Sequence, residues 1–237
     1  MTAISATGKS GVAASRVYHR SEALPAPAMH RPLIVIDVDE VVLAFVDALE
    51  AWLGARELHL ARDGFALNGN VRRTDGEAVT TVELRSLLHG FFDEAAHDMA
   101  PLPGAIDGIA SFSPAADVVF LSNLPAAAAV ARRTNLDALG LRHALIVNEG
   151  PKGPALARLV AGMAAPVVFM DDSPSNIASA RAAVPAATLV HFVADAGFRA
   201  TLTPGPDIAL FTGDWDEAAR FVTDNIDGYL QSTGAVE

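Results

Sequence analysis

Residues 33–42 read LIVIDVDEVV, an apolar run that ends on two acids. Four aliphatic residues, three of them β-branched, precede Asp37, and Asp39 follows two positions later. Such a run is typical of a strand buried on both faces, as in a parallel sheet. Because ligands bind at the carboxyl ends of parallel strands, both acids are candidates for a functional site at the edge of a sheet.

The composition restricts the class of protein. The chain has 237 residues, 51% of them hydrophobic, which suits either one large domain or a core domain with an insertion. The absence of cysteine excludes disulfides and thiolate metal sites, so a metal would need oxygen or histidine ligands. No apolar run is long enough to span a membrane, and the net charge of −11 argues against nucleic-acid binding. We therefore expect a cytoplasmic protein that binds neither membranes nor nucleic acid, with its oligomeric state open.

The region before the first strand, residues 1–30, is rich in Ala, Ser and Pro and lacks periodicity. It predicts a disordered extension. Lys9, Arg16 and Arg20 precede the first acid, Glu22, which leaves an organellar transit peptide as the alternative.

Beyond residue 100, apolar strand patterns alternate with helical ones. The predicted strands cover residues 117–121, 144–147, 166–170 and 187–192, and a closing amphipathic helix covers residues 215–230. This alternation predicts an α/β fold with a mostly parallel sheet and right-handed crossovers. We assign residues 31–46 and 100–237 to this core.

Residues 47–99 fit the alternation poorly and are predicted to be an insertion. A helical pattern runs from Val41 to about Arg56. Three Asp-Gly or Asn-Gly turn dipeptides follow between residues 63 and 76, and Thr80 and Glu83 form a capping-box pattern before another helix.

Polar residues follow four of the predicted strands, where a parallel sheet brings them to one edge. They are Asp37 and Asp39, Ser122 and Asn123, Lys152, and Asp171 and Asp172. Each group alone is equally well explained as a helix N-cap, so the inference rests on their joint occurrence.

Clustered carboxylates repel one another, and a hard cation such as Mg²⁺ relieves that repulsion while keeping positions for a phosphate. A hydroxyl, a lysine and free backbone N–H groups suit the other phosphoryl oxygens. The set therefore predicts phosphoryl transfer, with one carboxylate as a covalent nucleophile.

In order along the chain, these motifs resemble the four motifs of the haloacid dehalogenase (HAD) superfamily. The matching segments are residues 37–41, 121–123, Lys152 and residues 171–176. The resemblance implies a Rossmann-like three-layer α/β/α core with a mobile cap, here residues 47–99 in the type 1 position. It also implies Mg²⁺-dependent phosphatase chemistry through an aspartyl-phosphate.

The resemblance assigns catalytic roles by position. Asp37 would attack phosphorus, and Asp39 would protonate the leaving oxygen and then activate water. Ser122 would donate to a phosphoryl oxygen with help from the backbone of Asn123. Lys152 would pair with the nucleophile and the phosphate.

The same resemblance assigns the metal ligands. Asp172 and Asp37 would bind Mg²⁺ together with the backbone carbonyl of Asp39. Asp171 would be a further ligand or act through water. Asn176 stands where many relatives carry another acid, which leaves its part in the metal site open.

Two further details concern specificity. The dehalogenases of the superfamily lack an acid at the position of Asp39, because a halide leaves without a proton, so Asp39 favours phosphate esters. Glu40 replaces a frequent glycine and has no assigned role. Arg72 and Arg73 in the insertion are candidates to meet an anionic substrate.

We therefore expect a HAD-type phosphatase acting on a small phosphorylated metabolite, with a nucleotide or a sugar phosphate among the candidates. The alternatives are a phosphotransferase or phosphomutase that uses the same intermediate, a non-enzymatic phosphoacceptor, and a binding protein on the same fold.

Overall fold

A computed structural model describes residues 16–19 and 23–234. Its main sheet has seven strands in the order β1-β6-β5-β2-β7-β8-β9, and all of its strand pairs are parallel. The strands are β1 Val17–His19, β2 Leu33–Ile36, β5 Asp117–Asn123, β6 Ala144–Asn148, β7 Val167–Asp171, β8 Thr188–Phe192 and β9 Leu210–Thr212. The predicted α/β class with a parallel sheet is confirmed.

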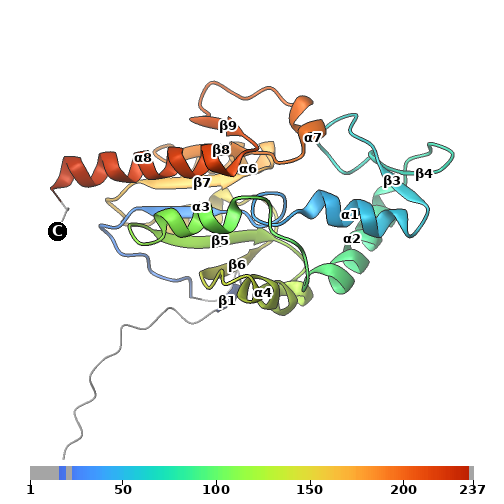
Figure 1. The fold of residues 1–237 in the computed structure, drawn as a ribbon, viewed down its shortest axis with the longest axis horizontal. Coiled ribbons are helices and arrows are strands. Elements are labelled where there is room, and N and C mark those ends of the chain that lie inside the picture. The colour runs from blue at the N-terminus through green and yellow to red at the C-terminus, as the bar shows by residue number, and fades with distance from the viewer. Residues whose placement is uncertain (1–15, 20–22, 235–237) are drawn as a thin grey trace, which may run out of the picture.

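Helices cover both faces of this sheet (Figure 1). The helices are α3 Ala105–Phe112, η1 Ala126–Ala128, α4 Ala129–Ala138, α5 Gly153–Leu159, α6 Pro174–Ala183, α7 Ala196–Ala200 and α8 Trp215–Thr233. Along β2, Ile34 and Ile36 pack into the hydrophobic cluster with α3, α4 and α8, whereas Leu33 and Val35 pack into the cluster with α5 and α6. The central strand is thus buried on both faces, as its sequence indicates.

The insertion lies at one end of the sheet, beyond the carboxyl end of β2 (Figure 1). It contains α1 Phe45–Gly54, the antiparallel pair β3 Leu58–Leu60 and β4 Val71–Arg73, and α2 Thr81–Ala95. Its two connections to the core run side by side, because Ala44 N–H donates to Ala100 O at 2.9 Å and Leu102 N–H donates to Val42 O at 2.8 Å. The predicted capping box at Thr80 is present at the start of α2.

Some elements differ from the sequence prediction. The first helix begins at Phe45 instead of Val41, because the N–H groups of Val42 and Leu43 both donate to Val38 O and close tight turns first. The short elements β9 and α7 were not predicted.

The prediction of a disordered extension over residues 1–30 is wrong for Val17–His19. These residues form β1, which gains backbone hydrogen bonds by pairing with β6 at the edge of the sheet. Residues 23–30 of the same range are described and form no helix or strand. Residues 1–15 and 20–22, on which the remainder of that prediction and most of the transit-peptide alternative fall, lie outside the described residues.

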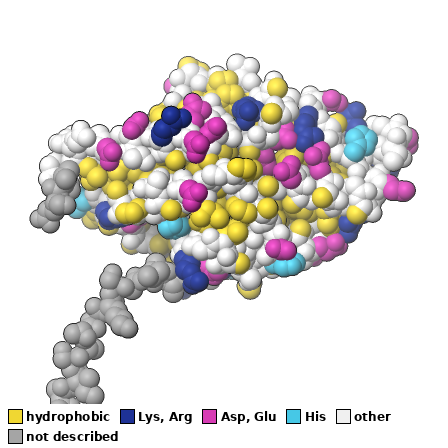
Figure 2. Space-filling model, in the orientation of Figure 1, with side chains coloured by type: hydrophobic (Ala, Val, Ile, Leu, Met, Phe, Trp, Pro, Cys, Tyr) yellow, Lys and Arg dark blue, Asp and Glu magenta, His cyan; other side chains and the backbone are white. Residues whose placement is uncertain are grey.

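Among the described residues, no helix is both long and apolar enough to cross a bilayer. On the face shown in Figure 2, basic side chains lie singly among acidic, apolar and neutral ones. The charge on this face is therefore dispersed and does not gather into a broad basic surface.

Candidate active site

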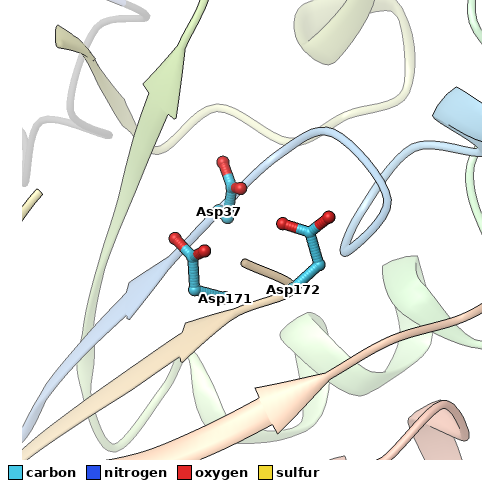
Figure 3. Close-up of side chains that lie close together, drawn as sticks. All are labelled: Asp37, Asp171 and Asp172. Carbon is cyan, nitrogen blue, oxygen red and sulfur yellow. The ribbon is translucent and has the colours of Figure 1, made fainter. Parts of the chain in front are cut away.

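Three carboxylates lie together at the carboxyl ends of the neighbouring strands β2 and β7. Asp37, Asp171 and Asp172 each offer one oxygen, and these oxygens all lie within 4.8 Å of one another. Figure 3 shows Asp37 following β2 and the other two at the end of β7. Asp37 N–H donates to Met170 O at 2.8 Å, so strand pairing itself fixes this arrangement.

Lys152 joins two of these carboxylates. Its Nζ lies 2.6 Å from Oδ1 of Asp37 and 2.7 Å from Oδ2 of Asp171, and its side chain is fully buried. The next residue, Gly153, allows α5 to approach α6 closely, since a Cβ there would lie 2.1 Å from Ser179 O. Helix packing therefore places the lysine at the cluster.

The cluster favours a cation. Burial, together with the charges of Asp171 and Asp39, raises the pKa of Asp37 to about 7 although Lys152 opposes the shift. Burial, followed by the charge of Asp37, raises the pKa of Asp172 well above its ordinary value. One ammonium does not balance three carboxylates, so a hard cation with oxygen ligands fits this donor set.

Asp171 already has several partners besides Lys152. Its Oδ1 accepts hydrogen bonds from Ser173 N–H at 2.9 Å and from Asn176 Nδ2 at 3.1 Å. Asn176 therefore holds Asp171 in place within the cluster. The resemblance leaves open whether Asn176 contributes to the metal site. The contact with Asp171 shows that Asn176 has a structural role.

Asp39 lies beside the cluster and is bonded to a buried arginine. Arg132 Nη2 donates to Asp39 Oδ1. Burial raises the pKa of Asp39, and the charges of Arg132 and Lys152 and the nearby Ser122 hydroxyl lower it. Asp39 Oδ2 and Ser122 Oγ are buried yet lack hydrogen-bond partners among the described residues. Buried polar atoms without partners indicate a place for a polar ligand.

Asn123 and the loop after β6 shape the same edge. Asn123 Nδ2 donates to Gly150 O at 3.0 Å, and its Oδ1 accepts from Asn148 Nδ2 at 2.8 Å. These bonds connect the segment after Ser122 to the segment before Lys152. They leave the proposed help of the Asn123 backbone as a prediction.

The two arginines expected to meet a substrate are engaged elsewhere. Arg72 forms an ion pair with Asp63 at 2.6 Å, and Arg73 forms one with Glu83 at 2.5 Å. Both arginines belong to β4, and neither lines the cavity next to Asp172. The structure does not bring them to the cluster, and their role in binding stays a prediction.

Glu40, which had no predicted role, has a defined position. Its φ of 61° lies in the left-handed region, which explains why glycine suits this position. Its buried carboxylate accepts from Val46 N–H and Asp195 N–H, both at 2.9 Å. Glu40 thereby connects the loop after Asp37 to the start of α1 and to the segment before α7.

Sequence reasoning missed Arg132. The residue lies in a helix whose sequence, AVARRTNLDA, shows two adjacent arginines among small residues. Arg133 is also buried and donates to backbone carbonyls of Leu141 and His143. Arg133 also has an acid four residues on, Asp137, with which it pairs at 2.8 Å, whereas Arg132 has no acid at that spacing in the helix, and this difference was the available signal.

Comparisons with solved structures bear on the fold. A HAD family hydrolase from Deinococcus radiodurans R1, with bound phosphate and sodium, is 18% identical with a TM-score of 0.52, covering 84% of this chain and 97% of that one. A protein described as a HAD hydrolase from Bacillus subtilis, bound to magnesium, is 15% identical with a TM-score of 0.53, covering 82% of this chain and 99% of that one. The L-2-haloacid dehalogenase PA0810 is 17% identical with a TM-score of 0.51, covering 82% of this chain and 100% of that one.

The chain has the HAD-like hydrolase fold. No family model and no curated protein matches its sequence. Because this fold carries both phosphate-binding and dehalogenating proteins, the reaction has to be argued from the site residues.

Proposed function

We propose that this protein is a Mg²⁺-dependent phosphatase that hydrolyses a small phosphomonoester through an aspartyl-phosphate on Asp37. The observation that carries the proposal is Asp39, whose buried Oδ2 has no hydrogen-bond partner among the described residues, as is also true of Ser122 Oγ. A halide leaves without a proton, whereas an alcohol needs one, and Asp39 supplies a carboxyl group for it.

The first step uses Asp37 as the nucleophile. Its Oδ1 accepts from Val38 N–H at 2.7 Å and from Lys152, which leaves Oδ2 to attack phosphorus. The bond between phosphorus and the ester oxygen breaks, and Asp39 gives its proton to that oxygen. Ser122 Oγ donates to a phosphoryl oxygen.

The second step reverses the role of Asp39. Its carboxylate takes a proton from a water molecule, whose oxygen attacks phosphorus. The bond between phosphorus and Asp37 breaks, and phosphate leaves. Arg132 holds Asp39 in place during both steps.

Asp37, Asp172 and the backbone carbonyl of Asp39 would hold Mg²⁺, with Asp171 as a further ligand or a partner through water. When bound, the ion neutralises the carboxylates and the phosphoryl oxygens. The raised pKa values of Asp37 and Asp172 and the oxygen-only donor set support this assignment.

The test is phosphate release from nitrophenyl phosphate by the wild-type protein and by Asp37→Asn. We expect wild-type turnover that requires Mg²⁺ and stops on chelation, and a folded variant without turnover. Asp93→Asn, an exposed aspartate on α2, is the matched control and should keep full activity. Full activity in Asp37→Asn, or turnover that persists in chelator, would overturn the proposal.

A phosphotransferase or phosphomutase would pass the same phosphoryl group from Asp37 to an alcohol. Product analysis with competing alcohols separates it from a phosphatase. Phosphorylated alcohol as the main product would favour transfer, whereas free phosphate at all alcohol concentrations favours hydrolysis.

A further inference from the structure

A cavity of about 470 Å³ lies directly beside the acidic cluster. It begins at Glu40 and Asp172 and extends between residues 65–67 of the insertion and Phe198 of α7. Because Asp172 is part of the carboxylate cluster, the cavity opens next to the place proposed for the phosphoryl group. Its volume is typical of a small-molecule site.

The walls of this cavity are mostly apolar. Aromatic rings line the cavity from both the insertion and the core. Phe65 of the insertion and Phe198 of the core form an edge-to-face contact, with 6.0 Å between their ring centroids. Phe45, Leu67 and Val193 add further apolar surface. Its two serines, Ser173 and Ser175, lie 2.9 Å apart through their hydroxyls. The cavity therefore favours an organic group that loses water on binding.

The cavity offers no positive charge to a second anionic group. None of the described residues that line it is a lysine, arginine or histidine. Arg62 is nearby, but it donates to Asp195 at 2.8 Å and to Glu50 at 2.7 Å. A carboxylate or a second phosphate would lie without a partner near Glu40 and Asp172, which is costly in an apolar site.

The acids do not make the cavity a site for organic cations either. Both oxygens of Glu40 already accept backbone N–H groups, Oε2 from Val46 and Oε1 from Asp195. Asp172 belongs to the proposed metal site. An ammonium group of the substrate would have to lose its water to reach a buried carboxylate that already accepts two N–H groups, or one proposed to bind the metal, and that loss is costly.

We propose that this cavity binds an uncharged, largely apolar organic group, so that the preferred substrates are phosphomonoesters whose only charged group is the phosphate. This inference rests on the proposed phosphatase function and narrows its substrate class. Nucleotides and acidic metabolites, which carry further anionic groups, would be poor substrates.

A matched set of alkyl esters tests the inference with leaving alcohols that differ only at the end far from the phosphate. Hexyl phosphate is compared with the same ester carrying a terminal carboxylate and with one carrying a terminal ammonium group. We expect kcat/KM for hexyl phosphate to exceed both by about tenfold or more, because the charged ends are desolvated without partners. A preference for either charged ester overturns the inference, as does equal use of all three.

Substitution of a cavity residue tests the location. Phe65→Ala should reduce the preference for hexyl phosphate over the carboxylate ester and weaken binding of naphthol, an uncharged fluorescent alcohol. Val82→Ala, at an exposed position of the same insertion, is the control. It should keep both the preference for hexyl phosphate and the binding of naphthol. An unchanged preference in Phe65→Ala, with unchanged naphthol binding, places the organic group elsewhere and overturns the assignment.

The two proposals fail in different ways. If phosphate release depends on Asp37 but the charged esters are preferred, the substrate class is wrong and the phosphatase stands. If Asp37→Asn keeps full activity, the proposed phosphatase mechanism is wrong, whichever of the three esters is preferred. Naphthol binding that Phe65→Ala abolishes would then still show that the cavity takes an apolar group.

Discussion

Arg132 on α4 donates a hydrogen bond to Oδ1 of Asp39, and the arginine side chain has no exposed surface. Its Nη1 lies 3.2 Å from Sδ of Met99, and its guanidinium lies 5.9 Å from the ring centroid of Phe92. Phe92 belongs to α2 of the insertion, and Met99 is the last residue of the insertion. The arginine thus fixes one oxygen of Asp39 and leaves Oδ2 buried without a hydrogen-bond partner among the described residues.

This contact predicts a leaving-group dependence. In Arg132→Lys, the shorter side chain with a single ammonium group should hold Asp39 less well than the guanidinium does. Asp39 should then be poorly placed to give its proton. We expect kcat/KM for an alkyl phosphate to fall by about 10²-fold or more, the usual size of a general-acid contribution. Nitrophenyl phosphate, whose leaving group needs no proton, should lose much less. Equal losses for both esters would show that the arginine has only a structural role.

Lys152 predicts a link between stability and metal binding. Lys152→Met leaves Asp37 and Asp171 buried without their cation, which should lower the free energy of unfolding by about 3–5 kcal/mol. Mg²⁺ should restore part of this loss, so its effect in urea denaturation should be larger in the variant than in the wild type. Arg158→Met, at an exposed position of α5, the helix that begins directly after Lys152, should change stability by less than about 0.5 kcal/mol. A Mg²⁺ effect that is no larger in Lys152→Met would contradict the link.

Much of this arrangement could be predicted from the sequence because it depends on local patterns. Apolar runs identify β2, β5, β6 and β7, and the residues that follow parallel strands must lie at one edge. The strand order, which local patterns do not give, places β2 beside β7 and so brings Asp37 next to Asp171 and Asp172.

The contacts that depend on packing between distant elements could not be predicted. Arg132 reaches Asp39 across 93 positions of the chain, and Glu40 reaches Asp195 across 155. Arg72 and Arg73 have the charge expected for substrate binding, yet local ion pairs to Asp63 and Glu83 engage both. Charge and residue type do not reveal such pairing before the fold is known.

Gly197 predicts how the insertion is held to the core. A Cβ at this position would lie 2.2 Å from Cδ of Arg62, so Gly197→Ala should displace the arginine from Asp195 and Glu50. Amide hydrogen exchange over residues 58–73 should then become about tenfold faster, and KM should rise. Gly205→Ala is the control, since nothing lies within 4 Å of its added Cβ. Unchanged exchange in Gly197→Ala would show that Arg62 does not hold the insertion.

His143 predicts a dependence of stability on pH that is separate from the active site. Burial, with the nearby charge of Arg133, lowers the pKa of His143 from its ordinary value of 6.5. The unfolded chain therefore binds a proton at a higher pH than the folded one, and the stability that the neutral ring provides is lost as pH falls below about 6.5. His143→Phe keeps a ring against Phe120, whose centroid lies 5.7 Å away, but removes this proton. Urea unfolding between pH 8 and pH 5 should give a shallower fall in stability for the variant, and parallel curves for the two proteins would contradict the assignment.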